Sequence, residues 1–251
     1  MNNITYTLVK NTLKNKMILT LLILLYAFLF FSASSFSHNN KGFFWNLYLL
    51  SGGEPDTSFI IFPFFFIITG KLYVDIIKNK EFIHRLKSKK RLLDIILLSN
   101  FIACFFITLS IVLISILCAA VFTRTFKESV LIPGILVSDY IMLIVNFIRS
   151  FLMIITLTSI EIYLLNRFSN KKISILILMI IDFCIGFSIF LVLPSHIEKL
   201  MPASFIYDNH LYRNLLECVI SSVIYYALNN YLIFKLNYKL INKVDFNFTN
   251  E

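Results

Sequence analysis

The chain has 251 residues, of which 58% are hydrophobic and 15% are charged, and its mean hydropathy is +0.81. A soluble domain carries about 25% charged residues and about 45–50% apolar ones, so this composition excludes an ordinary soluble enzyme and a disordered chain. We predict an all-α integral membrane protein. Its net charge of +9 would suggest nucleic acid in a soluble chain, but in a membrane protein it first indicates which loops are cytoplasmic.

Six apolar segments are long enough to cross a bilayer, whose hydrocarbon core of about 30 Å requires about 20 helical residues. We predict that each is a helix, because backbone groups in lipid must find their hydrogen-bond partners within the segment. The expected spans are Met17–Phe36, Ser58–Val74, Ile95–Phe122, Tyr140–Ile160, Ile173–Leu193 and Cys218–Phe234. Residues 1–251 are expected to form a single transmembrane domain.

The orientation of the chain follows from its Lys and Arg residues. With the N-terminus in the cytoplasm, 17 of them lie in cytoplasmic segments and 5 in outer loops, while Arg149 lies inside a span. This bias predicts a multi-pass protein of the cytoplasmic (inner) membrane with both termini in the cytoplasm. Topology therefore accounts for the charge, and no nucleic-acid partner is expected. The first apolar segment also has features of a signal peptide, but the five spans behind it favour an uncleaved helix.

Residues 3–16, ahead of the first span, place Ile4, Leu8 and Leu13 on nearly one face, with Lys10 and Lys14 elsewhere. The pattern predicts a short helix lying in the membrane interface. The alternative is a disordered polar leader.

The longest cytoplasmic loop, 75–94, has an apolar stripe at helical spacing formed by Ile76, Phe82, Ile83 and Leu86, with seven Lys or Arg residues around it. Such a helix could lie on anionic lipid, where each basic residue contributes about 1 kcal/mol. It could also dock in the groove of a partner protein. The two interpretations are compatible, and we favour docking.

The segment before the last predicted span contains Pro194 and Pro202 and is too apolar for a solvated loop. Irregular backbone at membrane depth must be covered by protein, so we expect short outer helices here that dip into the outer leaflet.

Two ionisable residues fall deep within predicted spans: Arg149 in the fourth and Asp182 in the fifth. Intramembrane ionisable residues are costly and often functional. The two spans are antiparallel neighbours and place both residues at similar depth, which predicts an Arg149–Asp182 pair. Its role could be structural, or it could line a translocation path or relay ions.

No catalytic motif is recognisable. The chain lacks HExxH, GxSxG-like and GxxxxGK[ST] sequences, and its four His residues fall in loops. We therefore expect no enzyme activity, no metal site and no cofactor on this chain, and any ATP would bind to another subunit. The four Cys residues form no CxxC motif and are interpreted as small hydrophobic residues.

Together these features resemble the six-span export-type ABC transporter permeases that carry no ATPase on the same chain. The resemblance rests on the N-terminal interfacial helix, the charged segment 75–94 between spans 2 and 3, and the proline-marked loop before span 6. It covers nearly the whole chain and is architectural. The small loops are similar to those of permeases for lantibiotic immunity and phenol-soluble-modulin export.

The resemblance implies a dimer with a second permease, identical or homologous, above two cytoplasmic ATPase subunits that would hold ATP and Mg. The segment 75–94 would be the coupling helix, with Phe82, Ile83, Arg85 and Leu86 as ATPase-coupling residues. The expected substrate is an amphipathic peptide or antimicrobial.

The family places its pathway mainly at spans 2 and 5, and the aromatic side chains Phe59, Phe62 and Phe66 of span 2 would form part of its wall. Alternatively these rings are lipid-facing bulk. The main competing function is a non-transporting membrane sensor, immunity or scaffold protein that acts by partner binding. A membrane enzyme and a gradient-driven secondary transporter are weaker alternatives.

Overall fold

The computed structural model describes residues 2–36, 55–79, 83, 86, 88–123, 129–132, 135–137, 139–168, 172–174, 176–178, 180 and 215–242. This part of the chain is almost entirely helical, as predicted. Its main helices are α1 (Asn2–Leu13), α2 (Lys16–Phe36), α4 (Pro55–Lys78), α6 (Lys89–Thr123), α7 (Asp139–Phe168) and α11 (Leu215–Ile241). A short antiparallel hairpin, β1 (Ser129–Ile132) with β2 (Ile135–Val137), joins α6 to α7 and was not predicted.

Five of the predicted apolar segments coincide with α2, α4, α6, α7 and α11. The remaining one, 173–193, is described only at residues 173–174, 176–178 and 180, all of which are helical. The largest boundary difference concerns α7, which was expected to end at Ile160 and continues to Phe168.

Within the described residues, two helices are long and apolar enough to cross a membrane, Lys89–Phe122 and Phe151–Phe168. A third candidate arises if Thr5–Leu13 and Lys16–Phe31, which are bent by 68° relative to each other, form one broken span. These candidate spans are compatible with the predicted membrane protein.

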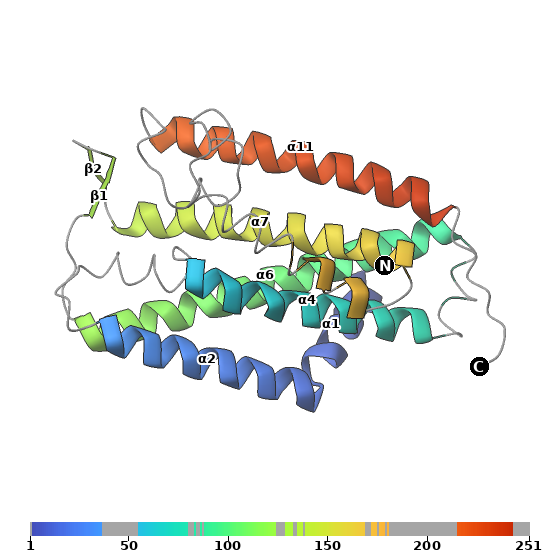
Figure 1. Cartoon of the computed structure of the whole chain (residues 1–251), viewed down its shortest axis with the longest axis horizontal. Coiled ribbons are helices and arrows are strands. Elements are labelled where there is room, and N and C mark those ends of the chain that lie inside the picture. Colours follow the sequence, from blue (N-terminus) through green and yellow to red (C-terminus); the bar gives the residue numbers. More distant parts are fainter. Residues whose placement is uncertain are drawn as a thin grey trace.

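The helices are arranged as an elongated bundle in which α2, α4, α6, α7 and α11 run roughly along the long axis (Figure 1). Helix α7 packs against α4, α6 and α11, and α2 packs against α6. The hairpin lies at one end of the bundle, and α1 lies toward the other end (Figure 1).

Helix α1 turns away from α2 and packs against α4 and α6. At the bend, the side-chain Oδ1 of Asn15 accepts a hydrogen bond of 3.0 Å from the backbone N–H of Met17. An Asn in this position caps the N-terminus of the following helix, so α2 begins as a separate helix and does not continue α1. A helix is therefore present ahead of α2 as predicted, and its location in a membrane interface stays a prediction.

In the part of the chain that the structure describes, two apolar clusters form the core. The main cluster lies between α2, α4, α6 and α7 and includes Tyr226 of α11. The second, which we call the end cluster, lies where the start of α6 meets α1 and the ends of α4 and α11. It consists of Val9, Leu72, Ile76, Leu92, Leu93, Ile96, Ala103, Ile162 and Ile241. The end cluster thus joins five helices at one end of the bundle.

The outside of the bundle is also apolar. Phe31 of α2, Leu117 of α6 and Leu232 of α11 are 67%, 64% and 56% exposed, and each has similar neighbours on its helix. Contiguous apolar surface of this kind is rare on soluble monomers and marks contact with a partner or with lipid.

Candidate functional site

Polar side chains gather inside the bundle around the second half of α7. We call this set the polar belt. All of its members are buried, and they are Thr69, Asn100, Thr156, Thr158, Ser159, Glu161, Asn166, Asn230 and Asn237. They come from α4, α6, α7 and α11, so the belt joins the helices that pack on α7.

Asn100 of α6 is the centre of the belt on one side of α7. Its Oδ1 accepts a hydrogen bond of 2.9 Å from the Thr69 hydroxyl of α4, and its Nδ2 donates one of 2.8 Å to Thr158 Oγ1 of α7. The Cys104 thiol, one turn along α6, lies 3.5 Å from the same Asn100 oxygen. Thr158 in turn donates to the carbonyl of Ile154, at 2.8 Å. One amide therefore connects three helices.

Two Asn residues of α11 make the equivalent connection on the other side of α7. Asn230 Nδ2 donates to Thr156 Oγ1 at 2.9 Å, and Asn237 Nδ2 donates to the carbonyl of Ser159 at 3.2 Å. Asn166 of α7 donates to Asn237 Oδ1 at 3.3 Å. These bonds hold α11 against α7 along about two helical turns.

The belt reaches the end cluster through tyrosines. The Tyr73 hydroxyl of α4 donates to Asn166 Oδ1 at 2.7 Å, and the Tyr238 hydroxyl of α11 donates to Asp94 at the start of α6. Partial burial, together with the hydrogen bond and negative charge of Asp94, raises the pKa of Tyr238 to about 12. Tyr238 lies beyond the end of the predicted last span, Cys218–Phe234. Its hydrogen bond to Asp94 therefore joins α11 to α6 outside that span.

Glu161 is the one acidic member of the belt, and its side chain is 0% exposed. It projects from the apolar part of α7, within electrostatic range of the Cys104 thiol. A buried carboxyl group is costly and is retained where it has a structural or functional role.

Chemically, the belt is a set of amides, hydroxyls, one thiol and one carboxyl. Such groups hold helices together in lipid and can line a polar path. Within the described ranges, no group of three or more His, Cys, Asp or Glu residues is placed to hold a metal ion.

The predicted coupling residues are described in part. Ile83 and Leu86 are half-buried and pack against the end cluster. Phe82 and Arg85 lie outside the described residues. The apolar stripe of segment 75–94 is therefore partly covered by the chain's own helices, with Ile76 fully buried as well.

The other predicted site residues are only partly described. Arg149 belongs to α7, but its side chain and Asp182 lie outside the described residues, so their pairing stays a prediction. The side chains of Phe59 and Phe62 in α4 also lie outside them. Phe66 is buried in the main cluster, so in this chain its ring faces protein and not lipid.

With this geometry established, comparison with known proteins adds no relative: no protein family, no curated protein and no solved structure matches the chain.

Sequence reasoning missed the belt, including Asn100 and Glu161. The predicted fourth span, Tyr140–Ile160, ends one residue before Glu161 and so leaves it outside. The signal that could have found it is the apolar sequence Ile162 to Leu165 that follows, which continues the helix. Ser99, Asn100 and Thr108 likewise stand out as polar residues within an apolar segment.

Proposed function

We propose that the chain is a permease subunit of an ATP-driven exporter. With a second permease and two separate ATPase subunits it would form a pathway that expels amphipathic peptides or antimicrobials. The proposal includes six spans, a location in the cytoplasmic membrane and cytoplasmic termini. It is supported by the apolar exterior, the polar interior and the bent pair α1–α2, which suits a helix in the interface leading into a span.

The observation that carries the proposal is the packing of the segment between the end of α4 at Lys78 and the start of α6 at Lys89, which we call the connector. Ile83 and Leu86 of this connector contact the end cluster, and that cluster contains side chains from α1, α4, α6, α7 and α11. Packed interiors transmit displacement because they have few voids. A push on the connector from the cytoplasmic side would therefore reach all five helices, as a coupling segment requires.

The first test is purification of the tagged chain from its native membrane in mild detergent, with mass spectrometry of the co-purifying proteins. We expect a stoichiometric ATPase subunit. Recovery of the chain alone, from cells shown to contain such an ATPase, would contradict the proposal.

A second test separates ATPase binding from coupling. Phe82→Ala with Arg85→Ala should reduce ATPase association. Ile83→Ala should leave association largely intact but lower substrate-stimulated ATP hydrolysis, because the connector would no longer grip the end cluster. Lys90→Ala, an exposed change at the start of α6, is the matched control. If all three variants showed the same ATPase association and the same substrate-stimulated ATP hydrolysis, the segment would have no coupling role.

One observation favours the competing function, a non-transporting sensor, immunity or scaffold protein. The amides of the belt are bonded mainly to other members of the belt, which suits a static bundle. Inside-out vesicles containing the purified complex distinguish the two functions. ATP-dependent accumulation of a labelled amphipathic peptide supports export, whereas partner binding without accumulation supports the alternative.

The pathway itself is proposed along α4. Phe59 and Phe62 would contribute to its wall, while Phe66, which is buried, would reach it only after α4 moves. The proposed Arg149–Asp182 pair would add a polar contact between spans 4 and 5. Exchange of the two residues should restore function lost in each single reversal if they are in contact.

A further inference from the structure

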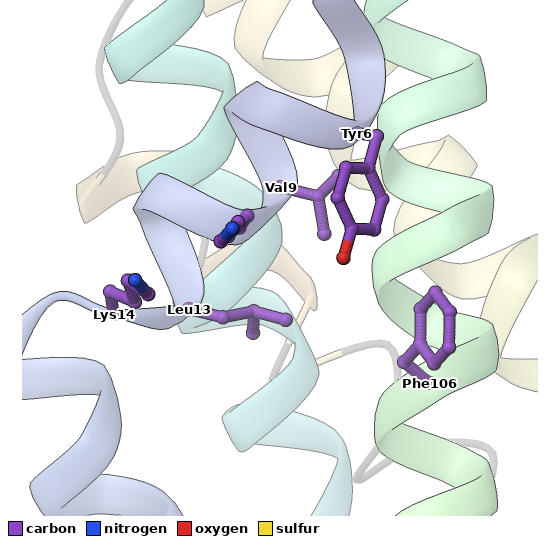
Figure 2. A pocket seen from close by; sticks show the side chains of 6 residues that line it. Tyr6, Val9, Leu13, Lys14 and Phe106 are labelled. Atoms are coloured by element: carbon purple, nitrogen blue, oxygen red, sulfur yellow. The ribbon is translucent and has the colours of Figure 1, made fainter. Parts of the chain in front are cut away.

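A groove of about 320 Å³ lies between α1 and α6. It is lined by Tyr6, Val9, Lys10, Leu13, Lys14 and Phe106. In Figure 2 the side chains of Tyr6, Val9 and Leu13 extend from α1 on one side, and Phe106 of α6 forms the facing wall. The groove is open on the outside of the bundle, since Tyr6 and Phe106 are both about half exposed.

The two ends of this groove differ in character. Lys10 in the last turn of α1 and Lys14 directly after that helix are exposed, just ahead of the bend. Phe106 lies within the candidate span Lys89–Phe122, beyond the buried Asn100. The groove therefore has two positive charges on the side of α1 and an apolar wall on the side of the candidate span.

We propose that this groove binds one anionic phospholipid, with an acyl chain between α1 and α6 and its phosphate beside Lys10 and Lys14. The volume is at the lower end of the range of about 300–1,000 Å³ usual for ligand sites, which suits a hydrocarbon segment and not a bulky head group. The apolar floor and the paired charges match the two halves of such a lipid.

The charges decide which lipid binds. An acyl chain gains little by leaving the bilayer for an equally apolar groove. Selectivity must therefore come from the head group, and two lysines near the surface, at about 1 kcal/mol each, predict a preference of about thirtyfold for anionic over zwitterionic lipid. The inference requires that the bundle lies in a bilayer but not that it exports anything, so it stands or fails independently of the transport proposal.

The test uses tryptophan fluorescence in reconstituted full-length protein. The chain has a single Trp, so Trp45→Phe gives a dark background in which Phe106→Trp reports on the groove. Vesicles of phosphatidylcholine are doped with brominated phosphatidylglycerol or brominated phosphatidylcholine, which quench tryptophan on contact. We expect half-quenching of the Phe106→Trp reporter to need about thirtyfold less of the anionic lipid.

Two matched controls localise the effect. Leu113→Trp reports from an exposed position on the same helix that does not line the groove, and it should be quenched equally by both lipids. In the Phe106→Trp background, Lys10→Gln with Lys14→Gln should abolish the preference. Lys235→Gln with Lys239→Gln removes the same charge from α11 and should leave it unchanged.

Three outcomes would overturn the proposal. Equal quenching of the Phe106→Trp reporter by both lipids would mean that bulk hydrocarbon fills the groove. Loss of the preference in both lysine pairs would mean a general surface potential. Absence of quenching by either lipid would mean that a second copy or another protein covers the groove. If the double lysine variant fails to fold, Lys10→Gln and Lys14→Gln are measured singly, and each should reduce the preference severalfold.

Discussion

Two surfaces of the same helix show how this molecule differs from a water-soluble protein. On α11, Leu228 and Leu232 are more than half exposed, while Asn230 and Asn237 are buried. A soluble helix places its amides outside and its leucines inside. The reversed pattern is compatible with an apolar medium around the bundle, as are the candidate spans.

The comparison also explains what holds the bundle together. In a bundle surrounded by lipid, leucines would gain nothing by leaving their environment, and the helices would associate through close packing and hydrogen bonds. The belt supplies those bonds where α4, α6 and α11 meet α7. The hydrogen bonds of the belt thus determine which helices pair on α7.

The largest effect is expected from a charge on the exterior. Leu117→Asp places a carboxylate on the outside of α6, at a cost of about 3 kcal/mol if that surface faces lipid. We expect membrane-integrated protein, measured after carbonate extraction, to fall at least about tenfold. Leu117→Phe is the control and should integrate normally. Normal integration of the Asp variant would mean that this surface of α6 does not face lipid.

The next effect concerns the interior. Asn100→Ala removes the amide that joins α4, α6 and α7 and leaves buried hydroxyl groups without their partner. The free energy of unfolding in mixed micelles should fall by about 1–2 kcal/mol. Asn11→Ala changes an exposed amide on α1 and should have almost no effect. Equal losses of unfolding free energy in the two variants would mean that the belt does not stabilise the bundle.

A smaller, pH-dependent effect is expected from Tyr238. Its pKa is raised from 10.0 to about 12, so the protonated form is favoured in the folded state. The stabilisation is complete below pH 10 and is lost as the pH rises through about 12. Tyr238→Phe should lower the free energy of unfolding by about 0.5–1 kcal/mol at pH 8, and the difference should vanish near pH 12. The control is Tyr231→Phe, an exposed change on the same helix; a pH-independent difference would contradict the tie to Asp94.

The smallest effect is expected at the Lys71–Asp75 pair of α4. The 2.7 Å bridge joins two side chains that are about one-third exposed and one helical turn apart. Lys71→Met should change the free energy of unfolding by less than about 0.5 kcal/mol. A larger loss would place this pair inside the network that holds the bundle.

How far the sequence predicts this structure depends on what each signal measures. Hydropathy located α2 and the end of α6 closely, because a long apolar segment predicts a helix, but it placed the start of α6 at Ile95, whereas that helix begins at Lys89. It placed the end of the fourth apolar segment at Ile160, although α7 continues to Phe168 through Glu161 and the apolar residues beyond it. The hairpin between α6 and α7 left no comparable pattern in its short strands.

The candidate site was less predictable than the fold. Helical spacing identified Ile83 and Leu86 as one apolar stripe, but it could not tell a partner's groove from the chain's own end cluster. The belt depends on which helices are neighbours, and tertiary contacts such as Thr69 with Asn100 leave no local signal. The groove between α1 and α6 depends in the same way on the 68° bend, which Asn15 alone does not specify.

We expect the apolar exterior of the bundle to face lipid and the belt to face protein. In the Trp45→Phe background, Leu232→Trp and Tyr226→Trp place a reporter on the outside and on the inside of α11. After reconstitution, brominated phosphatidylcholine should quench the first strongly and the second hardly at all, and aqueous acrylamide should quench neither. Strong quenching of Leu232→Trp by acrylamide, with none by brominated lipid, would mean that the exterior of α11 faces water and not lipid.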